Sequence, residues 1–166
     1  MKRATASALA AIALIAQGCR QTQPATSTEE VQPAEGVVTT VVDADSIHVI
    51  LGERTERIRL IGVDAPEVDH PDQPAECYGH ESANFTQRTL EGRSIRIEFD
   101  VERRDRFDRV LAYVFHDSEL FNEKLVAEGF AVERSYPPNL AHQEELRRAD
   151  AEARQNGRGL WGACER

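Results

Sequence analysis

The sequence predicts an α+β domain built mainly of β-strands. Five short segments between residues 37 and 115 are β-branched or alternate apolar with polar residues, and turn or loop residues separate them. Helical spacing of apolar residues is found in three other segments. The order is three strands, a helix, two strands and two helices, without regular strand–helix alternation. This order fits a small closed barrel better than a parallel sheet.

The first three strands are expected before residue 64. They are Val37–Val42, Ser46–Leu51 and Arg54–Val63. The first is rich in β-branched residues, and the other two alternate on either side of a Gly52-Glu53 turn. Residues 64–78 contain three prolines and several acids, which predicts a loop.

The second half of the domain is expected to add three helices and two strands. The predicted helices are Glu81–Leu90, Leu120–Glu128 and Leu140–Gln155, and the predicted strands are Ser94–Phe99 and Val110–Phe115. A glycine follows each helix within two residues, as is typical of helix C-termini. Leu160-Trp161 is expected to pack back as a C-terminal anchor.

The N-terminal region predicts export. Residues 1–18 begin with Lys2 and Arg3 and continue as an uncharged apolar run too short to span a bilayer, which is typical of a signal peptide. The ending before Cys19 resembles a bacterial lipobox, so we expect Cys19 to be lipidated and to attach the protein to a membrane. Plain secretion is the alternative. Residues 19–36 are polar and predict a disordered tether, and residues 37–166 form the folded domain.

Two cysteines remain after Cys19 is set aside. In an oxidising compartment, Cys77 and Cys164 predict a disulfide, and two unrelated buried thiols are the alternative. They do not suggest zinc, because no histidine pair accompanies them. The five histidines are scattered and receive no role.

The chain is strongly acidic, which bears on whether it can bind nucleic acid. The whole chain carries −9, and residues 19–166 carry −11 once Lys2 and Arg3 are removed. Binders of nucleic acid without sequence preference are usually basic. An acidic chain can still bind phosphate locally through arginines and a bound cation, but its long-range attraction is weak.

Three short segments contain the residue types that phosphodiester hydrolysis requires. They are residues 43–46 (DADS), 59–67 (RLIGVDAPE) and 105–109 (DRFDR). Together they supply carboxylates for a hard metal ion, arginines for a phosphate and one further carboxylate for proton transfer. Each alone is a weak signal, because an Asp-x-Asp turn often caps local backbone. The three in this order make a strong signal.

The order and spacing of these segments resemble the staphylococcal (micrococcal) nuclease family. The resemblance covers residues 37 to about 161, nearly all of the folded part. It implies a five-stranded oligonucleotide-binding-fold barrel with three helices. It also implies a calcium site formed by Asp45, Asp64 and the main-chain carbonyl of Ala65. If the first and third strands are neighbours, the two aspartates converge at one barrel mouth, and such oxygen ligands suit Ca²⁺. Asp43 is expected to support these ligands.

The same resemblance implies the remaining roles. Arg59 and Arg109 are expected to clamp the phosphate, because a guanidinium presents a planar fork that matches phosphate oxygens. Glu67 is expected to activate or position the attacking water, and Pro66 stiffens the turn before it. Arg106 is expected to reach a phosphate.

Two residues of the third segment depart from the family pattern, and a tyrosine in a later loop resembles a family tyrosine. Phe107 stands where the family often has tyrosine. Phenylalanine lacks the phenol hydroxyl, so one possible hydrogen bond to the phosphate is lost. Asp108 stands where the family has glycine, and its charge can draw Arg109 away from substrate. Tyr136 is interpreted either as a platform for a nucleic-acid base or as an ordinary loop aromatic.

The sequence therefore predicts an exported, monomeric, calcium-dependent nuclease of DNA and RNA that leaves 3′-phosphate ends by resemblance. The alternatives are a non-catalytic nucleic-acid- or protein-binding barrel module and a structural lipoprotein of the cell envelope. The first alternative is disfavoured because the acidic and arginine residues are all present. The second is favoured only by the acidic composition.

Overall fold

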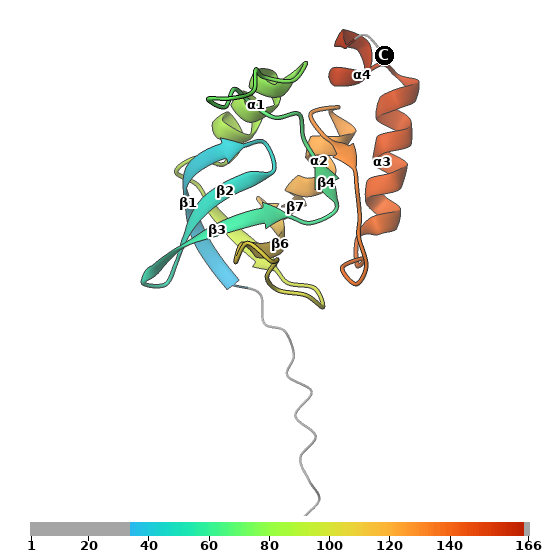
Figure 1. The fold of residues 1–166 in the computed structure, drawn as a ribbon. Helices are drawn as coiled ribbons and strands as arrows, with labels where there is room; N and C mark the ends of the chain where they lie inside the picture. Colours follow the sequence, from blue (N-terminus) through green and yellow to red (C-terminus); the bar gives the residue numbers. More distant parts are fainter. Residues whose placement is uncertain (1–33, 165–166) are drawn as a thin grey trace, which may run out of the picture. The chain divides into compact units, whose positions relative to one another are not determined.

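A computed structural model describes residues 34–164, and its central feature is a closed barrel (Figure 1). Strands β1 (Ala34–Asp43), β2 (Ser46–Leu51) and β3 (Arg54–Leu60) form an antiparallel meander. Strands β5 (Ser94–Glu98) and β6 (Val110–His116) form a second antiparallel pair. The barrel closes because β5 pairs with β1 and β6 pairs in parallel with β3. The predicted five-stranded barrel is confirmed.

Four helices lie among residues 34–164, and three of them match the helices that the sequence predicts. They are α1 (Gly79–Leu90), α2 (Phe121–Ala127), α3 (Gln143–Gln155) and the single-turn α4 (Leu160–Ala163). Helix α1 packs on β1, whereas α2 contacts β6 and α3 (Figure 1). The buried polar side chain of Asn122 on α2 holds the barrel by accepting the Val114 amide and donating to the Ile61 carbonyl, at 2.9 and 2.8 Å. None of the helices among residues 34–164 is long and apolar enough to cross a membrane.

Three expected boundaries are wrong by three residues, and the other boundaries of the predicted strands and helices differ by two residues or fewer. The tether does not reach residue 36, because Ala34–Val37 pairs with β5. The strand predicted to end at Val63 ends at Leu60, where Gly62 turns the chain with φ +78°. Helix α3 begins at Gln143 rather than Leu140. The signal peptide, the lipidation of Cys19 and the tether up to residue 33 lie outside the described residues.

Three two-residue strands are absent from the sequence-based expectation. They are β4 (Val63–Asp64), β7 (Glu119–Leu120) and β8 (Val132–Glu133). Strand β8 pairs with β4, so the chain after α2 lies beside the segment that carries Asp64. This small sheet brings residues from the C-terminal half of the chain to the candidate site.

Cys77 and Cys164 form a disulfide that joins the start of α1 to the end of α4. Their Cα atoms lie 5.9 Å apart, across a sequence separation of 87 residues. The bond fixes the C-terminal end of the described chain to the loop that also carries Glu67.

Candidate active site

The turn between β1 and β2 carries Asp43 and Asp45. Two hydrogen bonds from distant elements hold this turn. The buried hydroxyl of Thr86 on α1 donates to the Ala44 carbonyl at 2.8 Å, and the Leu60 amide donates to the Asp45 carbonyl at 2.9 Å. The turn is therefore fixed between α1 and the end of β3.

Asp45 is almost wholly buried, with 1% of its surface exposed. Its Oδ2 accepts the Ala65 amide at 2.9 Å, its Oδ1 accepts the Ser46 hydroxyl at 3.0 Å, and it forms an ion pair with Arg59 Nη1. A buried carboxylate needs such partners to offset the loss of hydration. These contacts join the first and second predicted segments directly.

Arg59 also binds the second predicted aspartate. Its Nη2 lies 3.0 Å from Oδ1 of Asp64. Burial lowers the pKa of Arg59 from its ordinary value, and the charge of Arg109 lowers it further, while Asp64 and Glu67 oppose the shift. The guanidinium keeps its charge at any working pH. The charges of Glu67 and Arg109 thus act on Arg59, which places all four groups in one electrostatic neighbourhood.

The convergence of Asp45 and Asp64 does not arise from neighbouring first and third strands. Strand β2 lies between them in the sheet, so that condition is not met. The aspartates instead meet because the β1–β2 turn contacts the chain that follows β3, through the bond between Asp45 and the Ala65 amide.

The third segment places Arg109 beside β3. Arg59 pairs with Leu111 in the parallel register of β3 and β6, so Arg109 lies just before the paired strand. Asp105 holds it: Arg109 Nε lies 2.8 Å from Asp105 Oδ2, and the Phe107 and Arg109 amides both donate to Asp105 Oδ1 at 2.9 Å. Burial acts to raise the pKa of Asp105, but these bonds outweigh it and the pKa is lowered.

The expectation that Asp108 draws Arg109 away is wrong. Asp108 has φ +61°, a left-handed conformation that explains why a glycine suits this position, and it turns toward Arg104. Arg104 Nη1 binds the Asp108 carbonyl at 3.0 Å and its carboxylate at 3.4 Å. Phe107 and Arg106 are exposed, and the Arg106 guanidinium lies 4.7 Å from the centre of the Phe107 ring. Arg106 is therefore near the site but outside its pocket.

A pocket of about 280 Å³ opens where these segments meet. Arg59 and Arg109 line it, and four residues of the chain after β8 also line it, among them Arg134 and the exposed Tyr136. Arg134 Nε lies 3.1 Å from Asp64 Oδ2. Hydrogen bonding to Tyr136 raises the pKa of Arg134, and the charge of Asp64 adds to the shift. The pocket thus presents three arginines and one aromatic ring.

Glu67 lies beside this centre on a tightly held loop. Its carbonyl accepts the Glu76 amide at 2.9 Å, and its amide donates to the Glu76 carboxylate at 3.2 Å. A Cβ on Gly79 would lie only 2.1 Å from the Glu67 carbonyl, so the first residue of α1 must be glycine for this close packing. The Glu67 side chain is 43% exposed, so water can reach it, and its Oε2 lies 3.6 Å from His70 Nε2.

The donors fit a hard cation. Asp45, Asp64 and the Ala65 carbonyl offer only oxygen, which Ca²⁺ prefers. Each carboxylate can accept about four hydrogen bonds or metal contacts. The hydrogen bonds and ion pairs described above therefore leave Asp45 and Asp64 able to contact a metal ion.

Comparison with known proteins agrees with this geometry. The sequence profile described as "Staphylococcal nuclease homologue" matches residues 57–163. The chain belongs to the staphylococcal nuclease family. It is 40% identical to a thermonuclease of Staphylococcus hyicus over 121 residues, which cover 73% of this chain and 72% of the relative. It is 38% identical to a thermonuclease of Staphylococcus intermedius over 135 residues, 81% and 80% of the two chains. Endonuclease YncB of Bacillus subtilis is 31% identical over 122 residues, 72% of this chain and 58% of the relative.

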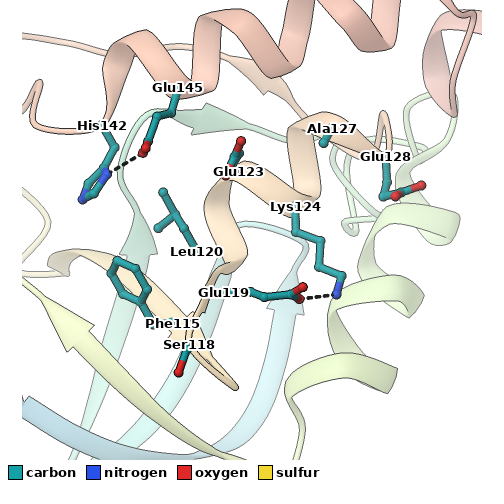
Figure 2. Close-up of a pocket in the computed structure, with 10 residues that line it drawn as sticks. All are labelled: Phe115, Ser118, Glu119, Leu120, Glu123, Lys124, Ala127, Glu128, His142 and Glu145. Atoms are coloured by element: carbon teal, nitrogen blue, oxygen red, sulfur yellow. Dashed lines mark hydrogen bonds and ion pairs between the residues drawn. The ribbon is translucent and has the colours of Figure 1, made fainter.

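This member of the staphylococcal nuclease family has a second, larger cavity of about 570 Å³ (Figure 2). No residue of the pocket above lines it. Its polar lining is mainly acidic, with Glu119 bound to Lys124 and Glu145 bound to His142, at 2.6 and 2.8 Å. An acidic cavity repels phosphate, so nucleic acid is better accommodated by the arginine-lined pocket.

Two pocket residues of this staphylococcal nuclease homologue were missed by sequence reasoning. Asp105 belongs to a segment that was singled out, and its position four residues before Arg109 was a usable signal. Arg134 gave no comparable signal, because it reaches Asp64 only through the pairing of β8 with β4.

Proposed function

We propose that this protein is a calcium-dependent nuclease that hydrolyses phosphodiester bonds of DNA and RNA and leaves 3′-phosphate ends. One observation carries the proposal: Arg59 bridges the carboxylates of Asp45 and Asp64 at the edge of a pocket that Arg109 also lines. Phosphate-binding cations and metal-binding oxygens thus meet at one point. Family membership and the names of the relatives support the same reaction class.

The side chains divide the chemistry among them. Arg59 and Arg109 bind the phosphate and stabilise the charge that accumulates on its equatorial oxygens in the transition state. Glu67 accepts a proton from the attacking water as the water oxygen bonds to phosphorus. The bond to the 5′-oxygen breaks, and the released 5′-oxygen takes up a proton from solvent to give a 5′-hydroxyl. Asp45, Asp64 and the Ala65 carbonyl would hold Ca²⁺, which supplies Lewis-acid polarisation of the phosphate when bound. Tyr136 offers its exposed ring to a base, and Arg106 adds a peripheral phosphate contact.

Cleavage of supercoiled plasmid and single-stranded RNA, with calcium or with a chelator, tests the proposal. We expect Asp45→Ala and Asp64→Ala to weaken calcium binding measured by calorimetry. Arg59→Ala, Arg109→Ala and Glu67→Gln should retain calcium binding but lower kcat by about 10²–10³-fold, or about 3–4 kcal/mol. Arg154→Ala is the control, since Arg154 forms a similar ion pair with Asp150 on α3. A parent that cuts neither substrate with calcium contradicts the proposal, and equal cutting in chelator contradicts the metal assignment.

A non-catalytic binding module or a structural envelope lipoprotein is the alternative. The acidic composition favours the structural lipoprotein, and the retained pocket arginines argue against the non-catalytic binding module. Nucleic-acid binding without cleavage in the same assay would support the binding module.

We further propose that the protein is exported and monomeric and that lipidated Cys19 attaches it to a membrane. The apolar run of residues 8–16 and the cysteine after Gly18 support this localisation. Cys19→Ser should move the protein from the membrane fraction to the soluble fraction. A parent already in the soluble fraction would favour plain secretion.

A further inference from the structure

We propose that Asp43, Glu67 and His70 form a binding site for one zinc-like divalent transition-metal ion, separate from the proposed calcium ligands. Because the site includes Glu67, its occupation would withdraw that carboxylate from the attacking water and inhibit cleavage. The inhibitory consequence rests on the function proposed above for Glu67, whereas metal binding does not.

The three side chains are close enough to share an ion. Each offers one ligand atom, and these atoms all lie within 4.8 Å of one another. His70 Nε2 lies 3.6 Å from Glu67 Oε2. Zinc bonds of about 2.0–2.1 Å in a tetrahedron place neighbouring ligand atoms about 3.3–3.5 Å apart. The histidine and glutamate are therefore spaced as two zinc ligands, and small side-chain rotations would bring in the aspartate.

Asp43 provides an independent reason to expect a cation. It is only 8% exposed, and its Oδ1 has no hydrogen-bond partner among the described residues. A buried carboxylate oxygen without a partner is unfavourable, and a bound cation is one of the few groups that satisfy it. Its neighbour Asp45, by contrast, has both oxygens engaged.

The loop positions the other two ligands before any ion binds. The His70 and Gln73 backbones exchange two hydrogen bonds, at 2.9 and 3.0 Å. Glu67 is fixed through Glu76 and by its close packing on Gly79, as described above. The loop therefore holds both backbones in place, so binding does not have to order them.

The donor chemistry distinguishes this site from the proposed calcium site. One imidazole nitrogen and two carboxylates suit zinc and similar ions, whereas Ca²⁺ prefers oxygen ligands alone. The two sites share no ligand, because the calcium set is Asp45, Asp64 and Ala65. Calcium and zinc can therefore be tested together on one protein.

Calorimetric titration of ZnCl₂ into the purified protein at pH 8 in excess calcium tests the site directly. We expect one zinc ion per chain in the parent. His70→Ala and Asp43→Asn should each raise the zinc dissociation constant more than about 10-fold, since even supporting residues of metal sites are worth that much. His80→Ala is the matched control, because His80 lies ten residues away and binds Asp69 at 2.8 Å. Circular dichroism verifies that each variant is folded.

Plasmid cleavage at the same zinc concentrations tests whether zinc inhibits the enzyme. The rate of each variant is compared with the rate of the same variant without zinc. We expect zinc to inhibit the parent and the His80→Ala variant at concentrations at least about 10-fold below those needed for His70→Ala. Absence of zinc binding in the parent, or equal affinity in the parent and both site variants, would overturn the inference. If zinc binds as expected but does not inhibit, the site stands and the role assigned to Glu67 is wrong. A parent inactive in calcium would leave the calorimetric test intact.

Discussion

Arg134 Nε lies 3.1 Å from Oδ2 of Asp64, and Arg59 Nη2 lies 3.0 Å from the other oxygen of that carboxylate, Oδ1. Arg59 approaches from β3, and Arg134 approaches from the chain after β8. The pairing of β8 with β4 creates this arrangement, and the Arg134 amide reinforces it by donating to the Gly62 carbonyl at 2.9 Å. The site therefore combines side chains from both halves of the domain.

Arg134→Ala should raise the KM for plasmid about 10-fold and change kcat by less than about 3-fold. An exposed arginine in the pocket adds a charged hydrogen bond to a flanking phosphate, worth about 1.5 kcal/mol, without contacting the reacting bond. Arg147→Ala is the control, because Arg147 is as exposed as Arg134, at 55% and 54%, and is not among the residues that line the pocket. An unchanged KM would mean that Arg134 only supports Asp64.

Asp105→Asn should lower kcat about 10-fold at pH 7, because Arg109 loses its charged partner while the amide oxygen still accepts the two backbone amides. It should also lower the free energy of unfolding by about 1 kcal/mol. The folded-state pKa of Asp105 is lowered, so its stabilisation is present above the ordinary value of 3.8 and is lost as the pH falls below that value. Urea unfolding between pH 7 and pH 3 should show the two proteins converging. A constant difference across that range would exclude this linkage.

A double variant with Cys77→Ser and Cys164→Ser should have a free energy of unfolding about 4–5 kcal/mol lower than that of the parent. This is the value that the chain-entropy model gives for the loop that the disulfide closes. The bond closes 87 residues of sequence separation. The parent treated with reductant serves as the control and should unfold at the same urea concentration as the variant. Free thiols at both positions in protein made under oxidising conditions would show that the bond does not form.

Salt should inhibit this enzyme less than it inhibits a basic nuclease. Three arginines line the pocket. If each of them binds one phosphate, log(kcat/KM) should fall with log[salt] with a slope no steeper than about −3 at fixed excess calcium. The remaining surface of a chain with net charge −9 repels DNA, and salt screens that repulsion. A slope steeper than about −5 would reveal a basic groove that the composition hides.

The barrel could be predicted from the sequence because the residues of each strand alternate between apolar and polar or are β-branched. Ser46–Leu51 alternates so regularly that both of its boundaries were predicted correctly. The short strands β4, β7 and β8 have only two residues each, too few for any periodicity. Ala34–Gly36 belongs to β1 because β5 offers it a partner, and its own composition gives no such signal.

The candidate site was predictable to the extent that its residues cluster in the sequence. Asp45, Asp64 and Arg59 belong to short segments whose chemistry is recognisable, and the structure brings them into contact. The partner of Asp108 was not predictable, since the choice between Arg104 and Arg109 depends on the left-handed backbone at that residue. His70 was passed over because its nearness to Asp43 results from folding.

The parallel pairing of β3 with β6 determines when, during folding, the two proposed phosphate-binding arginines come together. Arg59 and Arg109 are 50 positions apart in the sequence and become neighbours only when these two strands join. No shorter stretch of the chain brings both guanidinium groups to one phosphate. A chain held unfolded, as passage through an export channel requires, would therefore carry all the residues of a nuclease while remaining harmless to the cell that made it.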